Sequence, residues 1–423
     1  MKYWWYVGMI GLYSIVACTE HYRANTTPKY HPTLPNPLRA GDILISSSEW
    51  EAHRVYLKQI LARYQYGEAP DHRSLDKVEV KITDESYVFD SLATRQSWLF
   101  TIHKNGKQAS FRAGAIIPNR EGRFPAIIKN DRFRFDLSDI ENTKKAEQYR
   151  EKGRDRTQRF AAQEAVTRGY VFIKFIRGDI AADQPNNRDS GVLALYPNFN
   201  WGNIAAWGWA YSIIIDWLEE QPYVDADKIA VTGHSRGGKT ALYAGIYDER
   251  IAVTAPNSSG SGGTGSWRYF DPEQKPQTLV AVEPYHHFWF TDSLFHFADS
   301  TAYLPFDAHF GKMLIAPRGL VNMHARQDYW ANPYGTHLTH LAAQPIFDAY
   351  GKPDHLALHW REGDHNQNEE DWLALYDFCD WIFYGKPRIR TYNQNPHAHY
   401  QYDSILNPYF DYFGEFGIIT TEQ

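Results

Sequence analysis

Short apolar runs alternate with longer helical stretches along most of this chain. Apolar runs of strand length lie at 170–175, 314–321 and 356–360, and stretches of helical periodicity lie at 141–168 and 205–220. Strands that alternate with helices of this length are typical of a parallel sheet with helices packed on both faces. The pattern therefore predicts an α/β fold with a mainly parallel central sheet.

The pattern before residue 130 differs from the rest. A helix is expected over 49–66, ended by Gly67, and closely spaced strand-like runs follow it. We expect these runs to form an antiparallel edge of the same sheet. They lie at 78–82, 98–103, 111–117 and 126–129.

The stretch 256–310 interrupts the alternation of strands and helices. Its first part, 257–265, is too rich in glycine for regular structure, and the segment beyond it carries His286, His287, Trp289 and His296. An insertion of this kind after a strand commonly overhangs a binding site. We expect it to form a lid or a wall of the substrate site.

The first residues have the features of an export signal. Lys2 supplies a positive charge, 7–16 is a short apolar run, and Ile15-Val16-Ala17-Cys18 resembles the lipobox of bacterial lipoprotein signals. Cleavage before Cys18 would leave its thiol to be acylated, so we expect a protein anchored to a membrane by lipid. Thr19 in place of aspartate favours the outer membrane. The alternative is a plain secretory signal that is cut elsewhere.

These features divide the chain into four parts. Residues 1–17 are the expected lipoprotein signal peptide, and 18–38, with four prolines, reads as a tether. We expect the catalytic domain at 39–395 and a C-terminal extension at 396–423. The catalytic part contains no internal repeat and no change in amino-acid composition that would divide it into two domains.

Composition narrows the classes of partner. Hydrophobic residues at 43% and charged residues at 22% are ordinary for a globular protein, and the net charge of −6 offers no basic face to a nucleic acid. With Cys18 acylated, only Cys379 remains, so no intramolecular disulfide is possible. Cys379 lies in phase with the apolar positions of a helical pattern at 372–383, and we expect it to be a buried hydrophobic residue.

The stretch 233–237, Gly-His-Ser-Arg-Gly, carries the clearest chemistry. It is a complete G-x-S-x-G motif between an apolar run at 229–231 and a helical stretch at 239–247. This context is that of a nucleophile elbow, in which the serine hydroxyl stands on a tight turn between strand and helix. Ser235 is therefore the predicted nucleophile. A glycine-rich turn with an incidental serine is the alternative.

A serine hydroxyl needs a base and a group that orients the base. In hydrolases of this architecture an acid and then a histidine follow the serine along the chain, each just past a strand. Asp328 follows the expected strand at 314–321, and His365 follows the one at 356–360. We predict Ser235, His365 and Asp328 as the triad, with Asp364 and Glu283 as lesser candidates for the acid.

No metal, nucleotide or other cofactor is expected. The pair His286-His287 suggests zinc, but no spaced third ligand accompanies it. A polar wall of the site is the preferred interpretation of these two histidines.

Several motifs together resemble the glucuronoyl esterases, carbohydrate esterase family fifteen, and suggest a divergent bacterial lipoprotein member. The resemblance covers most of residues 45–385 and implies an α/β-hydrolase fold and a serine esterase. The motifs are Tyr-Gly-Glu-Ala-Pro at 66–70, Trp-Gly-Trp at 207–209, the elbow through Lys239, Asp-Glu-Arg-Ile at 248–251, Ser-Gly-Ser-Gly-Gly at 259–263 with Trp-Arg at 267–268, and Asp-Tyr-Trp-Ala-Asn-Pro at 328–333.

The resemblance also implies roles for individual residues. Arg236 would stabilise the oxyanion together with backbone N–H groups, and a structural salt bridge is the alternative. Lys239 and Trp267 would contact the sugar. Arg268 is also expected at the substrate, and the alternative is that it braces its loop.

Two departures from the family pattern affect the site. His234 stands where the family has cysteine, and Ser258 stands where the family commonly has its catalytic glutamate. Bacterial relatives often carry the acid after the later strand, and Asp328 occupies that position. A shift of the acid to Asp328 is our preferred interpretation.

The expected reaction is hydrolysis of an ester of a uronic acid carboxyl, with methanol or a lignin-type alcohol as leaving group, in plant cell-wall polysaccharide. One alternative is an acetyl esterase acting on xylan or another acetylated glycan. A second is a noncatalytic glycan-binding lipoprotein that has lost its acid at position 258.

Overall fold

The computed structural model describes residues 31, 33–135, 143–151, 153–271, 273–395, 397 and 399–420. The predicted signal peptide and Cys18 lie outside these residues. Among the helices of the described part, none is long and apolar enough to cross a membrane.

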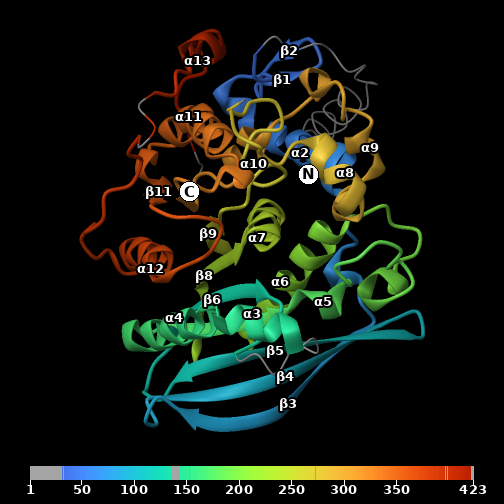
Figure 1. The fold of residues 1–423 in the computed structure, drawn as a ribbon, viewed down its shortest axis with the longest axis vertical. Coiled ribbons are helices and arrows are strands. Elements are labelled where there is room, and N and C mark those ends of the chain that lie inside the picture. The colour runs from blue at the N-terminus through green and yellow to red at the C-terminus, as the bar shows by residue number, and fades with distance from the viewer. Residues whose placement is uncertain are drawn as a thin grey trace, which may run out of the picture.

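A mixed sheet forms the centre of the molecule (Figure 1). Six neighbouring strands, from β11 to β7, are parallel, whereas β5, β4 and β3 continue the sheet antiparallel. This arrangement confirms the predicted mainly parallel sheet. In the described residues its order is β11 (Leu356–Arg361), β10 (Gly319–Ala325), β9 (Ile251–Asn257), β8 (Val224–His234), β6 (Phe124–Asp131), β7 (Val171–Ile176), β5 (Lys107–Pro118), β4 (Ala93–Lys104) and β3 (Lys77–Val88).

The strand β6 departs from the expected antiparallel edge. It lies between β7 and β8 and runs parallel to both, with Ile128 opposite Ile173 on one side and Val231 on the other. Its residues are buried almost throughout, as expected for a strand with neighbours on both edges and helices on both faces. The spacing of the apolar runs along the chain does not reveal that β6 lies between β7 and β8.

The strand β10 begins later than its apolar run predicts. The run at 314–321 starts just after α10 (Ala308–Met313), and the turn residues 314–318 separate that helix from the strand. An apolar run of this length does not distinguish a buried turn from a buried strand. The loop that carries Asp328 nevertheless follows the strand, as predicted.

Helices cover both faces of the sheet (Figure 1). One face packs against α6 (Asn203–Glu219), α7 (Arg236–Tyr247), α10 and α11 (Pro333–Ala349). The other face packs against α4 (Arg154–Arg168) and α12 (Glu369–Tyr384), in which Cys379 is fully buried as predicted. The remaining helices are α2 (Trp50–Leu61), α3 (Thr143–Glu151), α5 (Arg177–Ile180), α8 (Leu279–His286), α9 (Asp292–Phe295) and α13 (Asp403–Phe410), and a short ribbon joins β1 (Arg39–Ala40) to β2 (Ile43–Leu44).

Two expected helices have a different form. The single helix predicted at 141–168 is two helices, α3 and α4, with Gly153 between them at a φ of 63°. The helix predicted at 49–66 ends as α2 at Leu61 and continues as one π turn to Gly67, whose φ is 82°. Only glycine adopts such positive φ values without a steric cost, so both breaks follow from the sequence.

The folded unit extends beyond 39–395 at both ends. Leu34 and Leu38, in the segment expected to be a tether, are buried in the main core, and His309 Nε2 donates a hydrogen bond to Pro35 O at 3.0 Å. In the expected C-terminal extension, Tyr409 is fully buried in the same core. Residues 33–38 and most of 399–420 therefore pack as parts of the domain.

Candidate active site

Ser235 lies on the sharp turn between β8 and α7. Its φ of 58° and ψ of −122° are strained for a residue with a side chain, and the surrounding backbone holds it there. The Ser235 N–H donates to Asn257 O at 2.9 Å, and its carbonyl accepts from the Gly238 N–H at 2.8 Å. A Cβ at Gly233 would lie 2.3 Å from Gly237 O, so the turn requires the first glycine of the motif.

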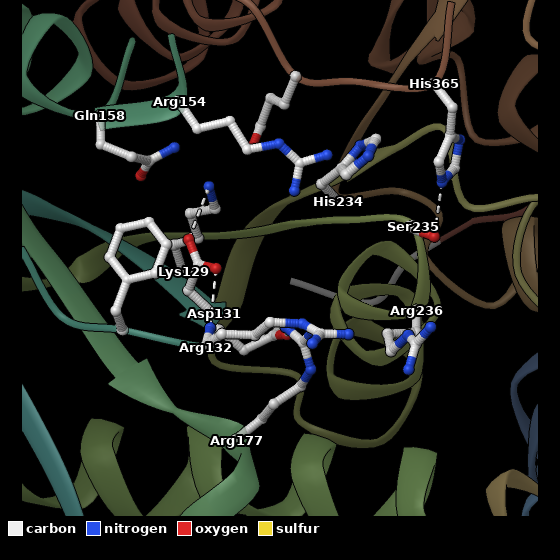
Figure 2. A pocket seen from close by; sticks show the side chains of 13 residues that line it. Lys129, Asp131, Arg132, Arg154, Gln158, Arg177, His234, Ser235, Arg236 and His365 are labelled. Atoms are coloured by element: carbon white, nitrogen blue, oxygen red, sulfur yellow. Dashed lines mark hydrogen bonds and ion pairs between the residues drawn. The ribbon is translucent and has the colours of Figure 1, made fainter. Parts of the chain in front are cut away.

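Ser235, His365 and Asp328 form a continuous chain of hydrogen bonds. His365 Nε2 lies 2.8 Å from Ser235 Oγ, and His365 Nδ1 lies 2.7 Å from Asp328 Oδ2 (Figure 2 shows the first of these contacts). The three residues follow β8, β11 and β10 respectively. Because the carboxyl ends of parallel strands meet at one edge of a sheet, residues distant in sequence come together there.

The environment of Asp328 keeps its carboxyl ionised. The residue is 2% exposed, and burial alone would raise its pKa, but the hydrogen bond from His365 and the nearby His324 and His234 lower the pKa to about 2. An ionised carboxylate only accepts hydrogen bonds, so Nδ1 of His365 carries the proton. Nε2 of the neutral imidazole is then the acceptor that faces the Ser235 hydroxyl.

The other candidate acids do not occupy this position. Asp364 is exposed, and its Oδ1 accepts a hydrogen bond from Asn366. Glu283 lies in α8, within the insertion at 256–310. Because Nδ1 of His365 is already bonded to Asp328, neither residue orients the base in this structure.

Ser258, at the position of the family's common glutamate, lies just past the end of β9. It is buried with a φ of 42°, and its N–H donates to Met323 O at 2.8 Å. Its Oγ has no hydrogen-bond partner among the described residues. Ser258 thus offers no carboxylate, and the carboxylate that contacts His365 lies in the loop after β10.

His234 packs beside the imidazole of His365. The two ring centroids are 4.6 Å apart, and His234 Nδ1 donates to Asn257 Oδ1 at 2.6 Å. Burial and the neighbouring His365 hold the pKa of His234 well below its usual value, so it remains neutral. Its ring restricts the movement of His365, a role that its place in the motif does not reveal.

Arg236 is held by Trp289, from the insertion at 256–310, and by Asp183, which the sequence did not single out. One guanidinium nitrogen donates to Asp183 Oδ2 at 2.5 Å, and the guanidinium carbon lies 4.5 Å from the centre of the Trp289 ring. Trp289 Nε1 in turn donates to Asp183 Oδ1 at 3.1 Å. The salt bridge considered for Arg236 is therefore present, and it fixes the guanidinium beside the elbow.

Trp289 connects the insertion at 256–310 to the site. The ring of His286 stacks on Trp289 with centroids 3.9 Å apart, whereas His287 pairs with Asp292 at 2.7 Å. Within the described ranges no group of three or more His, Cys, Asp or Glu side chains is placed to hold a metal ion. The histidine pair thus has aromatic and acidic partners of its own.

The structure places Lys239 and Trp267 behind the site. Lys239 is 2% exposed, and its Nζ donates to the carbonyls of Ser259 and Ser261 and to Gln277 Oε1. Trp267 is equally buried, with its indole N–H on Gln65 Oε1 at 2.8 Å. Neither residue lines the cavity next to Ser235, and both support the glycine-rich loop from within, so their expected contact with the sugar stays a prediction.

Arg268 braces its loop. Its side chain is 4% exposed, and its guanidinium donates to the carbonyls of Leu304 and Phe306 and pairs with the fully buried Asp307 at 3.3 Å. These partners use the guanidinium inside the protein. The expectation that Arg268 binds substrate is therefore corrected in favour of the alternative.

A cavity of about 210 Å³ opens beside the Ser235 hydroxyl. Ser235, His365 and Arg236 form one end, and Lys129 and Gln158 lie toward the other (Figure 2). The cavity is larger than the ~30 Å³ that one water molecule occupies in the liquid. A group of a substrate other than the reacting ester therefore has room there.

Comparison with known proteins identifies the family. A family model described as glucuronyl esterase, fungi, matches residues 100–351, more than half of the chain. The chain belongs to the glucuronyl esterase family. It is therefore a carbohydrate esterase with an α/β-hydrolase fold, as the resemblance implied.

Individual relatives agree with this assignment. Carbohydrate esterase MZ0003, from an unknown prokaryotic organism, is 27% identical over 406 residues, which cover 85% of this chain and 91% of its own. The 4-O-methyl-glucuronoyl methylesterase of Phanerochaete carnosa is 41% identical over 196 residues, 44% of this chain and 48% of its own. Among solved structures, a glucuronoyl esterase of carbohydrate esterase family 15 from Caldicellulosiruptor kristjansonii superposes with a TM-score of 0.72 and 28% identity, over 88% of this chain and 96% of that one.

Proposed function

We propose that this member of the family hydrolyses the ester of a uronic acid carboxyl in plant polysaccharide, with Ser235 as nucleophile, His365 as base and Asp328 as the acid of the triad. The observation that carries the proposal is the unbroken hydrogen-bond chain from Ser235 Oγ through His365 to Asp328. Each link is at a distance suited to proton transfer or orientation.

The reaction follows from the protonation states of these groups. Ser235 Oγ attacks the ester carbonyl carbon while His365 Nε2 takes the hydroxyl proton, and Asp328 stabilises the resulting imidazolium. The tetrahedral intermediate expels the alcohol, which leaves with the proton from Nε2. Water then gives a proton to Nε2 and attacks the acyl-enzyme, and the free uronic acid and the Ser235 hydroxyl are restored.

Arg236 is the proposed stabiliser of the oxyanion. The negative charge that develops on the carbonyl oxygen needs donors already in place, because reorganisation during the reaction would cost free energy. The salt bridge to Asp183 and the contact with Trp289 hold the guanidinium beside the nucleophile. The backbone N–H that follows the nucleophile, at the start of α7, commonly supplies a second donor in this fold.

The uronic acid is proposed as the acyl part on the basis of the relatives. The relative from Phanerochaete carnosa is a 4-O-methyl-glucuronoyl methylesterase, and the structural relative from Caldicellulosiruptor kristjansonii is a glucuronoyl esterase. The alcohol is then methanol or a lignin-type alcohol. Both leave the same acyl-enzyme, so the same triad serves either substrate.

An acetyl esterase is the second candidate. A structural relative described as a promiscuous esterase of the same family, from a marine bacterial metagenome, is 26% identical with a TM-score of 0.69. Promiscuity in that relative favours acetylated glycans as a second class of ester substrate for this protein. A noncatalytic glycan-binding role is disfavoured, because a binding protein has no need for an aligned triad.

One comparison of substrates tests the proposal. Purified protein is assayed with methyl glucuronate, methyl galacturonate and acetylated xylo-oligosaccharides, and we expect the highest kcat/KM on a uronate methyl ester. Ser235→Ala is expected to remove this activity, with a loss of at least about 10³-fold. A higher kcat/KM on acetyl esters would favour the second candidate, and activity that survives in Ser235→Ala would reject Ser235 as nucleophile.

We also propose that the protein is anchored by lipid at Cys18, facing an outer membrane. The support is the sequence alone: the positive charge of Lys2, the apolar run at 7–16 and the lipobox-like residues that end at Cys18. Expression in a bacterium with detergent phase partitioning tests this. We expect the wild type in the detergent phase and Cys18→Ser in the aqueous phase, and equal partitioning of the two would reject the anchor.

A further inference from the structure

The cavity beside Ser235 has a strongly cationic wall. Among its lining residues, a single carboxylate, Asp131, faces five basic side chains that come from different elements. In Figure 2 the long basic side chains extend toward the cavity from several directions. The five are Lys129 in β6, Arg132 after it, Arg154 at the start of α4, Arg177 at the start of α5 and Arg236 in α7.

Two acids are shared by more than one cation each. Asp131 Oδ2 lies 3.1 Å from Lys129 Nζ and also 3.1 Å from Nζ of the fully buried Lys174. Asp183 Oδ2 pairs with Arg236 at 2.5 Å and with Arg132 at 3.7 Å. Each of these two carboxylates is therefore shared by two cations.

Arg177 lies among these cations as a buried guanidinium. It is 6% exposed, its Nε has no hydrogen-bond partner among the described residues, its contact with Asn130 Oδ1 is long at 3.5 Å, and its guanidinium carbon lies 5.6 Å from the centre of the Trp207 ring. Burial and the neighbouring Arg132 lower its pKa to about 10. A buried guanidinium beside like charges is unfavourable unless an anion joins it.

The ester itself does not account for this wall. An esterified carboxyl is neutral, and the oxyanion that forms from it lies at the elbow, where Arg236 is already placed. The remaining cations extend from the elbow toward Gln158, along the cavity. A ligand bound there carries its negative charge at a second position, away from the reacting carbonyl.

We propose that this cationic wall is a subsite for a second oxyanion of the substrate that is ionised at neutral pH, a carboxylate or a sulfate on the sugar next to the esterified uronate. The preferred substrate is then a partly esterified acidic glycan, and a neutral chain with a single uronoyl ester is a poorer one. This inference rests on the proposed function. Guanidinium groups suit such an oxyanion because they donate paired, charge-assisted hydrogen bonds.

A matched pair of substrates tests the subsite. Digalacturonate carrying one methyl ester and one free carboxylate, as both positional isomers, is compared with its dimethyl ester, which carries a second, neutral methyl ester in place of the free carboxylate. We expect kcat/KM to be about tenfold or more higher for one charged isomer, because hydrogen bonds to charged groups are stronger than those between neutral groups. Added salt should reduce this preference.

The variant Arg132→Gln tests whether the cationic wall causes the preference for the charged substrate. It is expected to reduce the ratio of kcat/KM for the charged over the neutral substrate about tenfold. Arg120→Gln is the matched control, because Arg120 is exposed and lies over Phe124, outside the cavity. Its ratio is expected to equal that of the wild type.

The outcomes separate this inference from the proposed function. Hydrolysis of the neutral dimethyl ester tests the proposed function alone, and its absence together with no hydrolysis of methyl glucuronate would reject that function. If the neutral ester is hydrolysed but neither the carboxylate nor a sulfated neighbouring sugar raises kcat/KM, the subsite is rejected. A preference for one of these two anions supports it and identifies the source of the charge.

Discussion

Nδ1 of His365 lies 2.7 Å from Oδ2 of Asp328, a carboxylate from the loop after β10, while the residue just past the end of β9 is Ser258. The strands β9 and β10 are parallel neighbours, and the Ser258 N–H donates to Met323 O in β10. Their carboxyl ends therefore open onto the same edge of the sheet. An acid placed after either strand can approach the same histidine, which explains how the triad tolerates serine at position 258.

Replacing the acid tests this arrangement directly. Asp328→Asn keeps the size of the side chain but removes the charge and favours the wrong tautomer of His365. We expect kcat on methyl glucuronate to fall about 10⁴-fold, as for the equivalent change in other triads. Circular dichroism checks that the fold is retained.

The matched control is Ser258→Ala. The Ser258 hydroxyl is buried without a hydrogen-bond partner among the described residues, so its removal should leave kcat within about twofold. Loss of activity in Ser258→Ala with retention in Asp328→Asn would show that the acid function lies near position 258 after all.

Arg236 is expected to act on the transition state. Arg236→Met removes the guanidinium beside the elbow, and we expect kcat to fall about 10²–10³-fold with a small change in KM, as on loss of one oxyanion donor. The comparison is Asp183→Asn, which weakens the salt bridge but leaves the guanidinium present. Equal losses of kcat in the two variants would indicate that Arg236 serves only as a partner of Asp183.

Arg268 is expected to contribute to stability and not to substrate binding. Arg268→Gln leaves the buried Asp307 without its cation, and breaking a buried ion pair of this kind costs about 3–5 kcal/mol of unfolding free energy. Urea unfolding measures this loss. Arg73→Gln, which breaks an exposed pair with Asp71, should leave the unfolding free energy nearly unchanged, because solvent screens such a pair. A raised KM with unchanged stability in Arg268→Gln would instead place the side chain at the substrate.

The elbow and its partners were predictable because they depend on local chemistry and on chain order. The tight turn at Ser235 requires its glycines, and the order serine, acid, histidine follows from the succession of parallel strands. The same reasoning placed Asp328 and His365 in their loops, although the apolar run at 314–321, which predicted the strand β10, begins in a turn.

The supporting residues were not predictable in this way. Asp183 and Trp289 are each 53 residues from Arg236, in opposite directions along the chain, and no periodicity relates them. A motif also fixes which residues are neighbours in sequence but not which way their side chains point. Lys239 and Arg268 were assigned to the substrate for this reason, whereas burial and nearby carbonyl groups direct both into the protein.

The buried histidines predict a loss of stability in acid. His309 is fully buried, and burial lowers its pKa to about 3, so at pH 5 the folded state holds it neutral while the unfolded chain, with a pKa near 6.5, protonates it. The unfolded state then binds more protons, and stability falls as the pH drops below about 6.5. From pH 7.5 to pH 5 the titration of this residue alone should lower the unfolding free energy by about 2 kcal/mol.

His309→Gln lacks this titration, so its unfolding free energy, measured in urea at both pH values, should fall by about 2 kcal/mol less than that of the wild type. His399→Gln, at an exposed position, should retain the wild-type dependence. Identical pH dependence in the wild type and His309→Gln would contradict the buried neutral imidazole between α10 and the 33–38 segment.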